Sequence, residues 1–247
     1  MILENLKIKE EVKNTLFEKG YCIIATQLKN EKEILDKQLE ICSWVGNIRE
    51  HNPGKKDYIW PICVKKSESK IATFSEHNDE AELHTDTQYR DLPERYMTLS
   101  CIEPAKCGGG ETILLDSRVV IDRLNQDPEL LKMLHENFPI AVPDIFVKNS
   151  PRYIEHPIIS DYPKFRFRYD TFKKGIELQQ DYDMDRKLSV IEKLHSMIES
   201  SPEIFRYTLK KGEIILIDNH RVLHGRTSFS DYERLLYRVR VDDFQTK

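Results

Sequence analysis

The stretch Leu83-His84-Thr85-Asp86-Thr87-Gln88 contains a His-x-Asp pair, and the expected fold is arranged around it. Side chains two residues apart on an extended segment project to the same side, so His84 and Asp86 can bind one metal ion together. A histidine from a distant segment would complete three ligands, and His224 in Leu223-His224-Gly225-Arg226 is the candidate. His-x-Asp alone arises often by chance, so the surrounding sequence must support this interpretation.

Two imidazoles and one carboxylate on one face of a metal ion form the facial triad of non-haem iron(II) sites. This set leaves the opposite face open for a co-substrate and dioxygen, whereas a closed four-ligand site would serve only structure. His77 and His220 lie close to the proposed ligands in the sequence. We expect them to be surface or supporting groups.

The bulk composition favours one soluble domain over residues 1–247. Lys and Arg number 38 against 42 Asp and Glu, which gives a net charge of −4 and argues against nucleic-acid binding. No apolar stretch approaches the length of about 18 residues that a membrane span needs, and no secretory segment follows Met1. Five cysteines without a Cys-x-x-Cys pair indicate neither a disulfide framework nor a zinc knuckle. We expect a cytoplasmic protein with no membrane partner, and the sequence does not predict its oligomeric state.

The first part of the chain is expected to alternate helices and strands. Asn30 is a plausible N-cap, with Glu33 three residues later. The helix after it has an apolar stripe at i, i+4 and i+7. This stripe consists of Leu35, Leu39 and Cys42, widened by Ile34 and Ile41. The predicted elements are helices over 5–18 and from Asn30 to Gly46, and strands over 21–25, 57–64 and 71–74.

Further strands are expected on both sides of a helical region. Asp116 and Asp127-Pro128 each begin a helix, and Pro139 and Pro143 are expected to close this region. Phe165 to Asp170 alternates strictly, which places Arg166 and Arg168 on one face and the aromatic residues on the other. The other predicted elements are strands over 95–102, 112–115 and 213–217, a helix over 186–200, and a closing strand over 232–241 with Arg234, Leu236, Arg238 and Arg240 on one side.

These elements predict a mainly β protein with flanking helices. The core is expected to be a double-stranded β-helix, or cupin-like jelly roll, which encloses a pocket at its mouth. A helical insertion over about residues 116–205 would separate the two halves of the metal site.

Four motifs in this order resemble the TauD/TfdA family of Fe(II)- and 2-oxoglutarate-dependent dioxygenases, including its clavaminate-synthase-like amino-acid hydroxylases. Together they span residues 83–240, which is more specific than any one of them. The motifs are His84-Thr85-Asp86, Gly109-Gly110-Glu111-Thr112, Asp218-Asn219 through His224-Gly225-Arg226, and Arg234-x-x-x-Arg238.

The resemblance implies a role for each matching residue. His84, Asp86 and His224 would bind Fe(II), with 2-oxoglutarate and dioxygen as co-substrates. Arg238 would anchor the distal carboxylate of 2-oxoglutarate, with Thr112 hydrogen-bonded to the same molecule and Arg234 as the second arginine. The substrate-binding candidates are Arg168, Asp170 and Glu82.

The function implied is hydroxylation of an unactivated C–H bond, coupled to conversion of 2-oxoglutarate to succinate and carbon dioxide. A chain without a basic groove suggests a small polar substrate. The acidic approach to His84, together with Asp170, would suit a free amino acid, including a basic one. The alternatives are a sulfonate or another small organic acid, desaturation by the same chemistry, and a non-catalytic metal-binding jelly-roll module. Nucleic-acid demethylation is disfavoured by the lack of a basic, aromatic stretch, and halogenation by the presence of Asp86.

Overall fold

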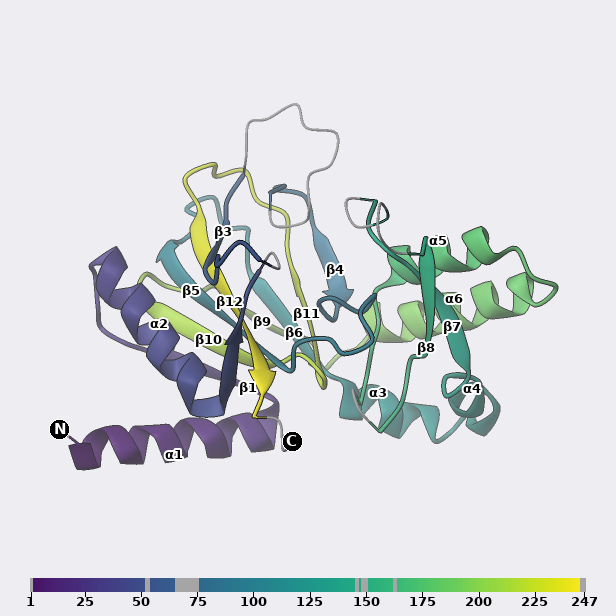
Figure 1. Ribbon diagram of the computed structural model, residues 1–247, viewed down its shortest axis with the longest axis horizontal. Coiled ribbons are helices and arrows are strands. Elements are labelled where there is room, and N and C mark those ends of the chain that lie inside the picture. The colour runs from purple at the N-terminus through teal and green to yellow at the C-terminus, as the bar shows by residue number, and fades with distance from the viewer. Residues whose placement is uncertain are drawn as a thin grey trace.

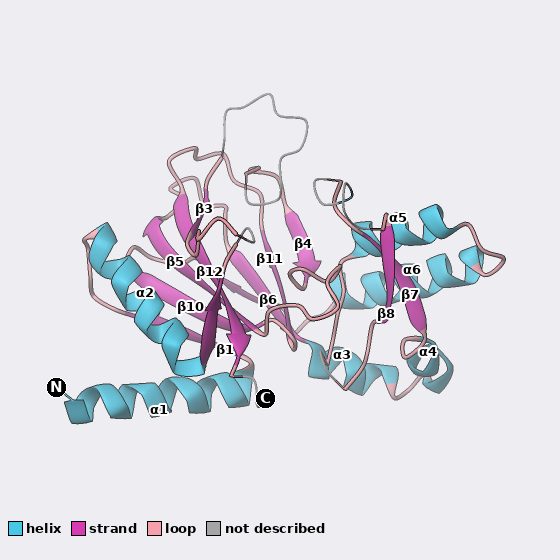
Figure 2. Ribbon diagram, viewed as in Figure 1, coloured by secondary structure: helices cyan, strands magenta, loops and turns pink. Residues whose placement is uncertain are grey.

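Two antiparallel β-sheets face each other at the centre of the molecule, and helices cover their outer sides (Figures 1 and 2). The computed structural model describes residues 2–51, 54–64, 76–144, 147, 151–161 and 164–244. The strand expected over 71–74 lies outside these residues. None of the described helices is long and apolar enough to cross a membrane.

The larger sheet has the strand order β1-β10-β5-β12-β2, and β3 pairs with β12. Its strands are β1 (Tyr21–Ala25), β2 (Gly46–Arg49), β3 (Trp60–Ile62), β5 (Tyr96–Glu103), β10 (Glu213–Asp218) and β12 (Leu235–Asp243). The strand predicted over 57–64 is observed only over Trp60–Ile62. The closing strand, predicted over 232–241, spans Leu235–Asp243. Leu236, Arg238 and Arg240 do share one face of β12, whereas Arg234 precedes the strand.

The smaller sheet has the order β4-β11-β6-β9. Its strands are β4 (Ala81–His84), β6 (Thr112–Asp116), β9 (Phe205–Tyr207) and β11 (Val222–Arg226). Apolar side chains fill the space between the two sheets, as in a jelly roll. This interior cluster comprises Ile62, Met97, Leu99, Cys101, Leu114, Leu209, Ile215, Ile217, Val222 and Leu236. The predicted mainly β, double-stranded β-helix fold is confirmed.

Helices α1 (Ile2–Lys19) and α2 (Glu31–Val45) cover the outer face of the larger sheet. The side chain of Asn30 accepts a hydrogen bond from the backbone nitrogen of Glu33, so the predicted N-cap is confirmed. The buried face of α2 includes Ile34 and Ile41 but also Gln38, and Leu35 is only partly buried. The side of α2 that faces the core is therefore rotated slightly from the predicted apolar stripe. The sequence pattern did not indicate this side because it carries the polar residue Gln38.

The segment between β6 and β9 holds four helices and a hairpin among its described residues. Asp116 and Asp127 cap α3 and α4 as predicted. Pro139 does not close a helical region, because it lies inside β7. The elements are α3 (Ser117–Leu124), α4 (Pro128–Met133), β7 (Asn137–Ala141), β8 (Tyr153–Pro157), α5 (Tyr169–Gln179) and α6 (Met184–Glu199).

The expected alternating strand over 165–170 is wrong. Phe165 makes only an isolated bridge with Ile159, and α5 begins at Tyr169 with Arg168 as its N-cap residue. Arg166 is buried together with Phe165 and Phe167, whereas Arg168 is only partly buried, so the two arginines do not share one environment. The Arg166 guanidinium instead donates to backbone carbonyls of the loop that follows β4.

Candidate active site

Strand pairing brings the two candidate histidines together. His84 ends β4, and its direct partner across the antiparallel pair is His224 in the middle of β11. Their ring centroids are 4.6 Å apart. The close approach of the two strands depends on Gly225, where a Cβ atom would lie 2.4 Å from the carbonyl oxygen of Ala81.

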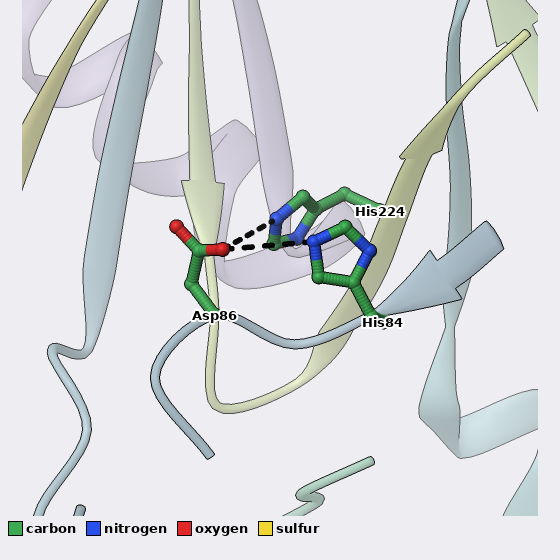
Figure 3. Close-up of side chains that lie close together, drawn as sticks. All are labelled: His84, Asp86 and His224. Carbon is green, nitrogen blue, oxygen red and sulfur yellow. Dashed lines mark ion pairs between the residues drawn. The ribbon is translucent and has the colours of Figure 1, made fainter. Parts of the chain in front are cut away.

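Asp86 completes the cluster from the turn after β4 (Figure 3). Its Oδ1 atom is 3.6 Å from Nε2 of His84 and 3.8 Å from Nε2 of His224. The candidate ligand atoms all lie within 4.8 Å of one another, and all three residues are buried. These separations exceed a hydrogen bond and are compatible with one ion bound at about 2.0–2.2 Å from each atom.

The protonation states suit a metal ion. Burial lowers the pKa of His84, which favours the neutral imidazole. Nδ1 of His84 lies 2.7 Å from the carbonyl oxygen of Glu82. Because a carbonyl only accepts hydrogen bonds, Nδ1 carries the proton and Nε2 is the nitrogen whose lone pair can bind a metal ion.

Asp86 is ionised despite its burial. Burial alone would raise the pKa of the Asp86 carboxyl, but Arg238 above all, with His224, His84 and Arg240, holds this pKa well below its ordinary value. An ionised Asp86 carboxylate beside the neutral His84 imidazole suits a divalent ion, which binds deprotonated ligands.

Arg238 and Arg240 form a charged layer behind Asp86. Nη1 of Arg238 donates to Oδ2 of Asp86 over 2.8 Å, and Nη2 of Arg240 is 3.7 Å from the same oxygen. Arg240 also pairs with the fully buried Glu94, with Nε at 2.7 Å from Oε1. Nε of Arg238 has no hydrogen-bond partner among the described residues.

Arg234 lies in a different part of the interior from Arg238. Its Nη2 atom is 3.4 Å from the carbonyl oxygen of Gly110, and Nη1 has no hydrogen-bond partner within the described part of the chain. The Arg234 and Arg226 guanidinium groups each lie 4.9 Å from the centroid of the Phe229 ring. Burial, followed by the charge of Arg226, lowers the pKa of Arg234 to about 10, so it stays charged at neutral pH.

Thr112 belongs to the same end of the interior as Arg234. It is buried, it follows Gly110 by two residues, and its partner on β11 is Arg226. Leu114, two residues further along β6, belongs to the interior cluster, so Thr112 faces the interior as well. The structure therefore separates Arg238, beside the candidate metal ligands, from Arg234 and Thr112.

The three substrate-binding candidates lie around the end of β4 and the start of α5. Arg168 and Asp170 pair with each other through two hydrogen bonds of 2.7 and 2.8 Å, so the Asp170 carboxylate already has a cation beside it. The Glu82 carboxylate is 55% exposed and lies 4.0 Å from Nε2 of His195. Of these candidates, Glu82 presents an acidic group to which no arginine of the described residues is bound.

The structure also shows site residues to which the sequence analysis assigned no role. The side chains of Glu94 and Asn219 are buried against the turn that carries Asp86. His51 stacks on Trp60, with ring centroids 4.0 Å apart, and Trp60 is the strand partner of Arg238. Burial, followed by the charges of Arg240 and Arg238, lowers the pKa of His51 to about 3, so this ring is neutral. His220 is not in the cluster, and its Nε2 lies 3.0 Å from the carbonyl oxygen of Pro93.

A jelly roll that carries two histidines and one carboxylate on paired strands and the turn beside them defines a class of metal-binding double-stranded β-helix proteins. The chain belongs to the family described as taurine catabolism dioxygenase TauD, TfdA family, whose profile matches residues 3–240.

Characterised relatives share part of the sequence. The mitochondrial trimethyllysine dioxygenase of Bos taurus is 27% identical over 176 residues, which cover 66% of this chain and 41% of that protein. Dioxygenase str8 of Strobilurus tenacellus is 24% identical over 194 residues, covering 77% of this chain and 44% of that protein. The chain therefore matches less than half the length of these relatives.

Solved structures share the fold across almost the whole chain. An asparagine oxygenase in complex with Fe(II), 2S,3S-3-hydroxyasparagine and succinate superposes with a TM-score of 0.76 at 14% identity, covering 96% of this chain and 79% of that one. The non-haem iron oxygenase OrfP, in complex with Fe and α-ketoglutaric acid, superposes with a TM-score of 0.70 at 16% identity, covering 96% of this chain and 80% of that one.

Proposed function

We propose that the protein is an Fe(II)- and 2-oxoglutarate-dependent dioxygenase that hydroxylates a C–H bond of a small polar molecule, namely a free amino acid. The observation that carries the proposal is the buried cluster of His84, Asp86 and His224, whose ligand atoms lie within 4.8 Å of one another. Family membership supports it, as do the relatives and structural neighbours named as dioxygenases and oxygenases. When bound, iron and 2-oxoglutarate would supply the oxidising chemistry.

We assign His84, Asp86 and His224 as the iron ligands. The imidazoles contribute Nε2, and Asp86 contributes the negative charge that a divalent ion needs. Arg238 reduces the repulsion between the Asp86 carboxylate and any second anion that enters the site, because its guanidinium lies against Oδ2. The chain thus places a guanidinium directly against the one carboxylate of the candidate ligand set, at the place where anionic ligands would arrive.

Our assignment of the two arginines differs from that implied by the resemblance. If 2-oxoglutarate bound the metal ion at one end, its far carboxylate would need a cationic partner at another place in the interior. Arg234 and Thr112 suit this far carboxylate, because they lie away from Asp86 and because Nη1 of the buried Arg234 lacks a hydrogen-bond partner among the described residues. Arg238 touches Asp86 and is therefore placed for a carboxylate close to the metal, such as that of an amino-acid substrate.

The substrate class follows from the charges near the metal ligands. The Nε atom of Arg238, which has no partner in the described part of the chain, can donate to a substrate carboxylate, and the neutral His51 ring adds no competing charge. Glu82 is the candidate for an ammonium or guanidinium group, because Asp170 is already paired with Arg168. A free amino acid with a basic side chain would offer its carboxylate to Arg238 and its basic group to Glu82. The structural neighbour OrfP, a mutant of which was solved in complex with (3S)-hydroxy-L-Arg, supports this substrate class.

A panel of free amino acids, small organic acids and sulfonates tests the substrate class. Each compound is incubated with protein, Fe(II), 2-oxoglutarate and dioxygen, and succinate formed above the uncoupled background is measured. We expect the strongest stimulation from amino acids, and a weaker response to basic ones in Glu82→Gln. Stimulation by sulfonates alone would contradict the amino-acid assignment, and succinate formation by Asp86→Ala would contradict the metal site.

A further inference from the structure

Asp86 differs from the other two candidate ligands in how the fold holds it. His84 and His224 lie on paired strands, so the β4–β11 pairing fixes both imidazoles. Asp86 lies beyond the end of β4, in a turn. Sheet hydrogen bonds therefore do not fix the carboxylate, and other groups must do so.

The side chain of Asn219 makes the main contacts to the backbone of Asp86. Its Oδ1 atom accepts a hydrogen bond of 2.7 Å from the backbone nitrogen of Asp86, and its Nδ2 atom is 3.3 Å from the carbonyl oxygen of the same residue. Nδ2 also donates to the carbonyl oxygen of Glu94 over 2.9 Å. Asn219 is only 1% exposed. It lies in the turn between β10 and β11, and β11 is the strand that carries His224.

The turn that carries Asp86 has an unfavourable conformation of its own. Thr87 has φ of 48°, which is rare for a β-branched residue and persists only where surrounding groups hold it. The Thr87 hydroxyl donates to the buried Glu94 carboxylate. Because Asn219 binds the backbone of both Asp86 and Glu94, one amide closes the loop from 86 to 94 at both ends.

We propose that Asn219 is a positioning residue for the metal site, which sets the Asp86 carboxylate relative to the two imidazoles. This inference rests on the proposed metal site and adds a residue to it. An amide is needed because one group must accept from an N–H and donate to two carbonyl oxygens. A side chain without this combination would remove hydrogen bonds from the backbone of Asp86, and the carboxylate would then be placed by its contacts with Arg238 and Arg240. Loss of such an outer partner typically weakens metal binding by about 10- to 100-fold.

The test compares metal binding by Asn219→Asp and Asn219→Ser with that of the wild type. The aspartate variant keeps the size and the acceptor but loses the donor. The serine variant keeps a hydroxyl in a smaller side chain, and it serves as a second variant if a carboxylate next to that of Asp218 prevents folding. Co(II) is the probe, because its visible absorption reports coordination geometry. The amount of Co(II) bound is normalised to the fraction of folded protein, which is measured by circular dichroism.

Gln38 provides a matched control. It is also a fully buried amide, with Nε2 donating to the hydroxyl of Thr98 and the carbonyl oxygen of Tyr237, and Oε1 accepting from Ser100. It lies on α2, on the outer side of the larger sheet. Gln38→Glu and Gln38→Ser should destabilise the protein in a comparable way but leave Co(II) affinity and spectrum unchanged.

We expect Asn219→Asp and Asn219→Ser to weaken Co(II) binding at least about tenfold and to alter the visible spectrum. Wild-type affinity and spectrum in both variants would overturn the role of Asn219 while leaving the metal site intact. Equal weakening in the Gln38 controls would overturn it as well, because the loss would then reflect general destabilisation. Failure of the wild type to bind Co(II) more tightly than His84→Ala would instead refute the metal site itself.

Discussion

His84 and His224 are direct partners across two antiparallel strands, and their rings lie 4.6 Å apart. A metal ion bound by both would therefore join β4 to β11, in addition to their backbone hydrogen bonds. Asp86 would add the turn after β4 to the same ion. Metal binding would consequently be linked to the stability of the smaller sheet.

Metal binding should raise the thermal stability of the protein. A ligand at 100 times its dissociation constant adds about 2.7 kcal/mol. For a domain of this size, that corresponds to a rise of roughly 5–10 °C in Tm. Differential scanning fluorimetry with Co(II) measures the rise, and His84→Ala should abolish it. An equal rise in His84→Ala would mean that Co(II) binds elsewhere.

Gly225→Ala should disrupt the pairing that brings the two histidines together. The added methyl group would lie 2.4 Å from the carbonyl oxygen of Ala81 and 2.9 Å from the Ile113 side chain. We expect a loss of about 1–3 kcal/mol in the free energy of unfolding, together with weaker metal binding. Urea denaturation checks the first effect and Co(II) titration the second.

Gly54→Asn serves as the control for Gly225→Ala. Apart from its chain neighbours, no described residue has an atom within 4 Å of a Cβ at Gly54, and asparagine tolerates its positive φ of 80° better than other residues with a side chain do. This change should leave metal affinity unaltered. A Gly225→Ala variant that matched this control in stability and affinity would show that the close strand approach is not needed.

Arg234→Gln and Arg238→Gln should affect different ligands. Loss of a hydrogen bond to a charged group costs about 1.5–3 kcal/mol, which corresponds to roughly a 10- to 150-fold change. We expect Arg234→Gln to raise KM for 2-oxoglutarate by this factor, and Arg238→Gln chiefly to raise KM for the primary substrate. Steady-state kinetics with each compound varied in turn separates the two effects. A larger 2-oxoglutarate effect in Arg238→Gln would restore the assignment implied by the resemblance.

The fold class and the cluster of candidate metal ligands could be predicted from the sequence because their signals are local or regularly spaced. Asn30, Asp116 and Asp127 cap helices through hydrogen bonds to residues two or three positions away, so the sequence alone indicates them. The His84-x-Asp86 spacing is likewise local. His224, in contrast, lies far from this pair in the sequence, and the order of the motifs was the signal that identified it as the third candidate ligand.

Other features depend on tertiary contacts that leave no periodic signal. Helix α5 was missed because Phe165 to Asp170 alternates like a strand, and because a glycine at position 175 is unfavourable inside a helix. Gly175 is required there because a Cβ would lie 2.3 Å from the carbonyl oxygen of Pro139. The contacts of Asn219 with Asp86 and Glu94 join segments more than 120 residues apart, so spacing could not reveal them.

Asp218→Asn should stabilise the protein at neutral pH. Burial raises the pKa of Asp218 from 3.8 to about 6, even though Arg95 lies nearby. Between these two pH values the folded state binds more protons at this residue than the unfolded state, so ionisation of Asp218 lowers stability as pH rises. Asparagine mimics the protonated form, and we expect a gain of about 1–3 kcal/mol at pH 7–8.

The gain from Asp218→Asn should shrink towards zero near pH 4, where the wild-type carboxyl is protonated in the folded state. Urea denaturation of both proteins between pH 4 and pH 8 measures the difference, and subtraction removes the titration of other groups. A gain that was constant with pH would show that the pKa of Asp218 is not raised.

The most direct test of the central claim is the visible absorption of the protein under anaerobic conditions with Fe(II) and 2-oxoglutarate. If His84, Asp86 and His224 hold iron with its opposite face open to the keto acid, a weak charge-transfer band should appear only when both components are present. The band should be absent in Asp86→Ala. Absence of the band in the wild type, together with tight binding of zinc, would contradict the account and indicate a non-catalytic metal-binding module.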